Sequence, residues 1–203
     1  LLSLLVAMFL THGISRLTAS AYLGCVGAVI VTLVTAIIAV KATALTGFAT
    51  DESVFLNLAT KGGLDFVALL IGGIIIGVIG VIDDITITQA SVVQELKSAG
   101  GHLTRSELYF RAMKVGKNHM GAVINTLILA YTGASLPLVL LLYVSESPIV
   151  QLINSEVITT EIVRTIVGSL GLLSAVPLTT LIAVFLMKKD DGPIHPGHTH
   201  HHH

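Results

Sequence analysis

Long apolar runs alternate with short polar segments along this chain. Four runs contain no Asp, Glu, Lys or Arg and approach the length of a bilayer crossing: Leu17–Val40 (24 residues), Phe66–Ile82 (17), Asn118–Ser145 (28) and Thr165–Met187 (23). About 20 apolar residues cross the hydrocarbon core, so each run is a predicted span, and the shortest must extend into its polar ends. With a further apolar stretch at Leu1–Leu10, the pattern predicts about five spans in an all-α, polytopic transmembrane helix bundle.

Composition supports a membrane protein. Hydrophobic residues make up 53% of the chain and charged residues 11%, and the mean hydropathy is +0.89; soluble domains carry about 25% charged residues. The net charge of −1 argues against nucleic acid as a partner, and the lipid bilayer is the expected surrounding. Residues 1–187 form the predicted transmembrane domain. Residues 188–203 form a polar, His-rich tail that we expect to be disordered.

The first residues carry neither an initiator Met nor a basic segment before the apolar stretch. A signal peptide would begin with such a basic segment. We therefore interpret the chain as starting inside a transmembrane helix, as the C-terminal portion of a longer protein.

The positions of the basic residues predict the orientation. Five of the eleven lie between the third and fourth spans: Lys97, Arg105, Arg111, Lys114 and Lys117. Basic loops stay in the cytoplasm, which places residues 85–117 and the C-terminus inside the cell. The acidic segment Ser145–Arg164 is then outside. This alternation leaves eight of the eleven bases on the cytoplasmic side.

Two amphipathic cytoplasmic helices are predicted between the third and fourth spans. The first is Ile85–Lys97, which continues the third span and ends before Gly100. The second begins at Thr104, whose hydroxyl can accept a hydrogen bond from the backbone N–H of Glu107. The Glu107 side chain can in turn accept one from the backbone N–H of Thr104. On the outer side, residues 148–161 are a candidate interfacial helix.

Two adjacent carboxylates, Asp83 and Asp84, follow the third apolar run. Ionisable groups near bilayer depth are costly and usually face a protein interior or a water-filled cavity. At helical spacing one face collects Gly73, Gly77, Gly80, Asp84, Thr88 and Ser91. We predict that the three glycines of this glycine face pack closely against another helix, and that Asp84 is the principal functional carboxylate.

Three interpretations of the carboxylate pair remain open. Adjacent carboxylates repel each other, an arrangement that suits proton or cation exchange. A Gly-x-Ile-Asp-Asp sequence also resembles Mg²⁺-dependent membrane transferases acting on polyprenyl phosphates, although their later Asp-rich loop has no counterpart here. In the structural alternative, the pair ends a helix and forms ion pairs with Lys114 or Lys117. No cofactor and no catalytic residue is assigned.

A polar stripe opens the fourth predicted span, where Asn118, Gly121, Asn125 and Thr132 share one helix face. Asn and Thr side chains either hydrogen-bond to neighbouring helices or line a polar pathway. His119 is a candidate proton shuttle or a hydrogen-bonding end residue. The candidate pathway residues are Asp83, Asp84, Thr88, Gln89, Ser91, Glu95, Asn118, His119, Asn125 and Thr126.

In the tail, His195, His198 and His200 are either metal ligands or part of an expression tag.

Two sequence blocks resemble the YibE/F family of multi-pass bacterial membrane proteins. The first is Gly80–Ser91, read GVIDDITITQAS and followed by Glu95; the second is Gly116–Gly121, read GKNHMG, which leads into Asn125–Pro137. The family often carries Arg-Asp where this chain has Lys117-Asn118. The resemblance implies a location in the bacterial cytoplasmic membrane and a missing upstream half, but no activity.

The favoured role is therefore that of a transporter or permease with a carboxylate-containing polar pathway. The alternative is a membrane scaffold that assembles with a paralogous half or with further copies of itself. A metal-dependent membrane transferase is the third and weakest interpretation, and the sequence assigns no enzyme activity.

Overall fold

The computed structural model describes residues 2–49, 51–100, 103–144 and 148–187, and every regular element within these ranges is an α-helix. The elements are α1 (Leu2–His12), α2 (Arg16–Ala42), α3 (Asp51–Ala59), α4 (Phe66–Ala99), α5 (Arg105–Ala134), α6 (Leu136–Val144), α7 (Ile149–Ile153) and α8 (Glu156–Leu186). The predicted all-α class is confirmed for the described residues.

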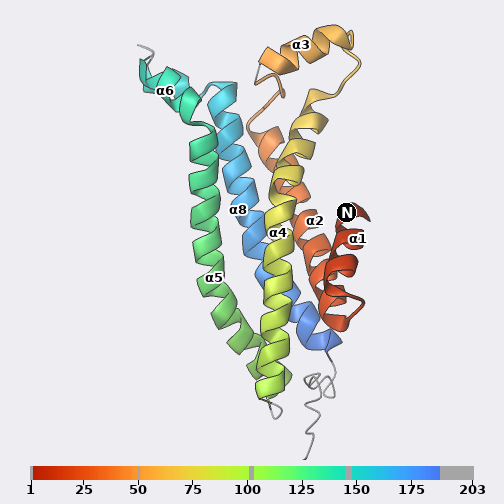
Figure 1. The fold of residues 1–203 in the computed structure, drawn as a ribbon. Coiled ribbons are helices and arrows are strands. Elements are labelled where there is room, and N and C mark those ends of the chain that lie inside the picture. The colour runs from red at the N-terminus through yellow and green to blue at the C-terminus, as the bar shows by residue number, and fades with distance from the viewer. Residues whose placement is uncertain (1, 50, 101–102, 145–147, 188–203) are drawn as a thin grey trace, which may run out of the picture.

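Helices α2, α4 and α8 form a three-helix core (Figure 1). Helix α5 lies along α8 on one side of this core, and α1 packs against the first half of α2 on the other. The short helices α3 and α6 lie at the same end of the bundle, which is called the α3 end below. Helix α8 begins at that end and runs antiparallel to α2 and parallel to α4.

Three of the described helices, α2, α4 and α8, are long and apolar enough to cross a membrane, so the predicted count of about five spans is not confirmed. Helix α1 has only 11 residues. The run Asn118–Ser145 is divided, because α5 ends at Ala134 and α6 begins at Leu136. Pro137 explains the division, since proline has no N–H to donate to the Gly133 carbonyl oxygen one turn earlier and its ring clashes with that carbonyl.

The predicted amphipathic helices are parts of longer helices. Helix α4 continues without a break through Asp83 to Ala99, and Gly100 caps its end. The capping box of Thr104 and Glu107 is confirmed. Helix α5 nevertheless continues from that box to Ala134, so the second amphipathic helix and the start of the fourth predicted span are one element.

Close contacts between glycine and threonine hold the core together. A Cβ atom at Gly24 of α2 would overlap the Thr179 hydroxyl of α8, and one at Gly171 of α8 would overlap the Thr32 hydroxyl of α2. All four residues are buried. The absence of a side chain at each glycine lets the two backbones approach, which is a frequent way of packing membrane helices.

The three glycines of the glycine face of α4 are not closely packed against another helix of this chain. A Cβ atom at Gly73 or Gly80 would meet nothing within 4 Å, and one at Gly77 would meet only the Tyr131 hydroxyl at 3.5 Å. The packed face of α4 is instead the aliphatic side, with Ile74, Val78, Ile82, Ile85 and Val93 fully buried. No helix of this chain packs closely on Gly73 or Gly80, so the close packing of this face stays a prediction. Both faces of α4 are apolar, and glycine spacing alone does not identify the inner one.

At the α3 end, one carboxylate connects α8 to the loop after α2. Glu156 accepts hydrogen bonds from the backbone N–H groups of Thr46 and Gly47, both at 2.7 Å, and from the Thr46 hydroxyl at 2.8 Å. Gly47 has a φ of +84° and lies so close to the Phe66 carbonyl that no Cβ atom would fit. This connection fixes the loop that leads into α3.

Candidate functional site

Helix α4 presents its two adjacent carboxylates to different surroundings. Asp84 is exposed, whereas Asp83 is half-buried and its Oδ1 atom is buried without a hydrogen-bond partner among the described residues. Neighbouring residues of a helix point about 100° apart, so only one of the pair can face the bundle. The structure places Asp83, rather than the predicted Asp84, on the inner side.

Asp83 faces α1 and α2. The titratable groups that interact with it electrostatically are His12 at the end of α1, the fully buried Cys25 of α2, and Asp84. Among the described residues no ion pair joins either carboxylate to Lys114 or Lys117. The geometry therefore does not support the structural alternative, in which those lysines neutralise the pair.

The depth of Asp83 follows from its neighbours. Ile82 and Ile85, on either side of it in sequence, lie in one buried cluster with Leu172 and Val176, which are central in the charge-free part of α8. Further along α4, Val93 packs with the last turn of α8, ten residues or about 15 Å beyond Asp83. Asp83 is therefore well inside the bundle and not at its end.

Gln89 joins three helices. Its side chain is 3% exposed, and its Nε2 atom donates to the Ala112 carbonyl oxygen of α5 at 3.1 Å and to the Thr180 hydroxyl of α8 at 2.7 Å. Thr180 in turn donates to the Val176 carbonyl oxygen at 2.6 Å. These contacts favour a structural role for Gln89 over the predicted role in a pathway.

We expect Gln89→Met to destabilise the bundle by about 1 kcal/mol, because hydrogen bonds between membrane helices contribute about 0.6–2 kcal/mol and methionine fills a similar volume. Thermal unfolding in detergent measures this, with the exposed Glu95→Gln as the control. Biological activity should persist. Loss of activity in a normally stable Gln89→Met variant would instead assign Gln89 to the pathway.

Among the described residues, no hydrogen bond joins the other candidates on α4 to another helix. Ser91 donates to the Ile87 carbonyl oxygen of its own helix at 3.0 Å, Thr88 is half-buried, and Glu95 is exposed.

The α5 candidates face away from the bundle. Asn118, His119, Asn125 and Thr126 are all exposed. Thr126 donates to the Ala122 carbonyl oxygen one turn earlier in the same helix at 3.0 Å. The buried face of α5 carries Leu108, Ala112, Gly116 and Leu127. Asp83 and the predicted polar stripe thus lie on different sides of the molecule, and this chain alone does not bring them together.

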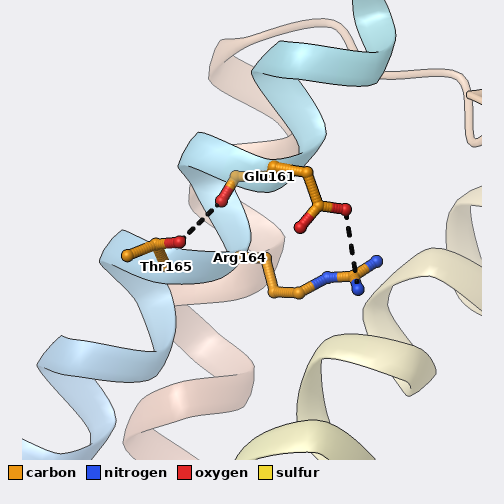
Figure 2. A network of polar contacts seen from close by, with 3 residues as sticks. All are labelled: Glu161, Arg164 and Thr165. Carbon is orange, nitrogen blue, oxygen red and sulfur yellow. Dashed lines mark hydrogen bonds and ion pairs between the residues drawn. The ribbon is translucent and has the colours of Figure 1, made fainter. Parts of the chain in front are cut away.

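A second polar group, near the α3 end, was not among the sequence candidates. On α8, Arg164 Nη1 lies 3.6 Å from Glu161 Oε1, and the Thr165 hydroxyl donates to the Glu161 carbonyl oxygen at 2.8 Å (Figure 2). The Nε atom of Arg164 and the hydroxyl of Thr160 are buried and lack hydrogen-bond partners among the described residues. The available sequence signal was the spacing of Thr160 and Arg164, which puts them on one face of a helix.

A metal site is not evident in the part of the chain that the structure describes, where no three His, Cys, Asp or Glu residues lie close enough together to hold an ion. The candidate tail ligands His195, His198 and His200 lie outside the described residues.

The comparisons with known proteins agree with the resemblance noted in the sequence. The family model described as YibE/F-like protein matches residues 1–189. No curated protein and no solved structure matches the chain.

Proposed function

Because the chain belongs to the YibE/F-like family and carries three helices able to cross a membrane, we propose that it is a transporter or permease of the bacterial cytoplasmic membrane. In this proposal Asp83 takes up and releases a proton during the transport cycle. Residues 85–117 and the C-terminus face the cytoplasm, as the basic residues in that segment favour.

The observation that carries the proposal is the position of Asp83. Its Oδ1 atom is buried inside the bundle, without a hydrogen-bond partner and without a Lys or Arg in ion-pair distance among the described residues. A carboxylate in such surroundings is costly unless its charge is compensated. Since no Lys or Arg among the described residues compensates Asp83, a mobile proton fits this position, and proton exchange is a function that membrane carboxylates serve.

Chemical modification tests whether Asp83 binds a proton inside the bundle. Dicyclohexylcarbodiimide partitions into membranes and modifies protonated carboxyl groups. We expect mass spectrometry to find the adduct on Asp83 in the native membrane, with a yield that falls as the pH is raised. The Asp83→Asn variant should lose this adduct and Asp84→Asn should keep it. An Asp83 that stays unmodified at acidic pH would contradict the proton-binding role.

A second candidate function, assembly with another membrane protein, is favoured by the outward polar stripe of α5. Asn118 and Asn125 are exposed on a helix that packs along the membrane-spanning α8, and Gly73 and Gly80 leave open space on the surface of α4. Amide groups facing lipid would lack hydrogen-bond partners. A second copy of the chain or a paralogous half would cover these surfaces. Full activity of Asp83→Asn together with loss of activity in Asn125→Leu would favour this function.

A further inference from the structure

A cavity of about 290 Å³ lies between α3, α4 and α8 at the α3 end of the bundle. Its polar lining comes from Glu52, Ser53, Thr160, Glu161 and Arg164. Its apolar lining includes Phe66, Leu69 and Leu70. We propose that this cavity binds a small zwitterion of the amino-acid class, with the ligand carboxylate at Arg164 and Thr160 and the ligand ammonium group at Glu161.

The carboxylate position follows from two polar groups that lack partners. Thr160 is only 3% exposed, and its Oγ1 atom is buried without a hydrogen bond. One turn further along α8, the Arg164 Nε atom is also buried without an acceptor. A buried donor without a partner is costly, so the pair favours an acceptor ligand. A carboxylate can accept from a guanidinium and a hydroxyl together, and hydrogen bonds to charged groups are the strong ones.

The ammonium position follows from the balance of charge. The cavity is lined by the paired charges of Arg164 and Glu161. A plain anion that took Arg164 would leave the Glu161 carboxylate without a counter-charge, and a plain cation would leave Thr160 and the Arg164 Nε atom without an acceptor. The contact between Arg164 and Glu161 is long, at 3.6 Å, which leaves Glu161 able to accept from a ligand ammonium. A zwitterion satisfies both halves of the site.

The remaining volume favours an aliphatic side chain. Phe66, Leu69 and Leu70 provide an apolar wall from α4, and Gly73 on the same helix also lines the cavity. A Cβ atom at Gly73 would meet nothing within 4 Å, so this position contributes space to the cavity. Ligand sites of this kind are mostly apolar, with a few polar groups that fix the orientation of the ligand.

The proposal that this cavity binds a zwitterion does not depend on the proposed transport function. Only the role of the cavity as a substrate site rests on that function. The sharpest test uses three probes of similar shape on the purified full-length protein: L-leucine, 4-methylpentanoate, which lacks the amine, and isopentylamine, which lacks the carboxylate. Isothermal titration calorimetry should show leucine binding at least about tenfold more tightly than either of the others. Leucine binding that is absent, or no tighter than that of a half-ligand, would overturn the proposal.

Variants locate the site. Thr160→Val keeps the shape and removes the hydroxyl, and it should weaken leucine binding about tenfold, as should Arg164→Gln. Glu161→Gln should weaken leucine binding and should not weaken the binding of 4-methylpentanoate, because it removes a carboxylate that repels this anion. The matched control is Thr159→Val, because the Thr159 hydroxyl already donates to the Ser155 carbonyl oxygen and the side chain is not part of the cavity lining. Equal affinities of Thr160→Val and Thr159→Val would contradict the site.

Two further measurements keep the outcomes distinct. Thermal unfolding without ligand identifies any variant that fails to fold, and the conservative Thr160→Val keeps the test decisive if Arg164→Gln is unstable. Asp83→Asn should bind leucine like the wild type, because Asp83 is not part of the cavity lining. If the wild-type protein binds leucine as expected but Asp83→Asn keeps full biological activity, the transport mechanism is rejected and the binding site is retained.

Discussion

Gly171→Leu should prevent stable folding of the bundle, whereas Gly80→Leu should leave it folded. At Gly171 even a Cβ atom would overlap the buried Thr32 hydroxyl, which donates to the Ala28 carbonyl oxygen of its own helix at 2.8 Å. A leucine there must push α2 and α8 apart. Overpacking a tight core typically costs about 1–3 kcal/mol, and we expect at least the upper part of this range because two backbones must separate. At Gly80 an added Cβ atom meets nothing within 4 Å, and the position is exposed, so a leucine has room.

Size-exclusion chromatography and thermal unfolding in detergent compare the two variants at equal expression. Gly171→Leu should aggregate or unfold at a clearly lower temperature, and Gly80→Leu should match the wild type. Similar stability of the two variants would mean that the contact between α2 and α8 does not hold the bundle together.

The same contacts reverse an expectation from the sequence. The close packing predicted for Gly73, Gly77 and Gly80 implies that Gly77→Leu is disruptive and that Val78→Leu, on a different face, is mild. Val78 is fully buried, however, and its Cγ2 atom is 3.0 Å from where a Cβ at Gly168 would lie. Periodicity separated the glycine face of α4 from the face that carries Val78. It could not decide between them because both are apolar, and the choice depends on neighbours that are distant in sequence.

Much of the helix content was readable from the sequence. The runs Leu17–Val40, Phe66–Ile82 and Thr165–Met187 correspond to parts of α2, α4 and α8. The capping box at Thr104 was recognisable from local residue types. The continuation of α4 past Asp83 was also expected, as the polar segment Ile85–Lys97, but the burial of part of that segment was not. That polar segment remains inside the bundle because Gln89 finds partners on α5 and α8.

The candidate site was predictable only in part. The carboxylate pair stood out in the sequence, but the inner member depends on the rotation of α4, which α2 and α8 determine by packing. The cavity near Arg164 was not predictable, because its lining comes from three helices and charge patterning suggested only an outer acidic segment. Side chains that meet only through tertiary packing leave little local signal.

Asp83→Asn should abolish the biological activity of the full-length protein while the protein remains folded and inserted. Asparagine keeps the size of the side chain and can still form hydrogen bonds, but it can neither carry the negative charge nor exchange a proton. Asp84→Asn should have a small effect, because Asp84 is exposed and its side chain points about 100° away from that of Asp83 around the helix. Asp83→Glu, which retains a titratable carboxyl group, should keep part of the activity.

The most direct test is growth complementation of a strain that lacks the gene, under the condition in which the deletion slows growth and with membrane levels of each variant matched by immunoblot. The account predicts that Asp84→Asn restores growth like the wild type and that Asp83→Asn does not, although both melt at the wild-type temperature in detergent. Growth of the Asp83→Asn strain at the wild-type rate would contradict the claim that Asp83 handles charge inside the bundle.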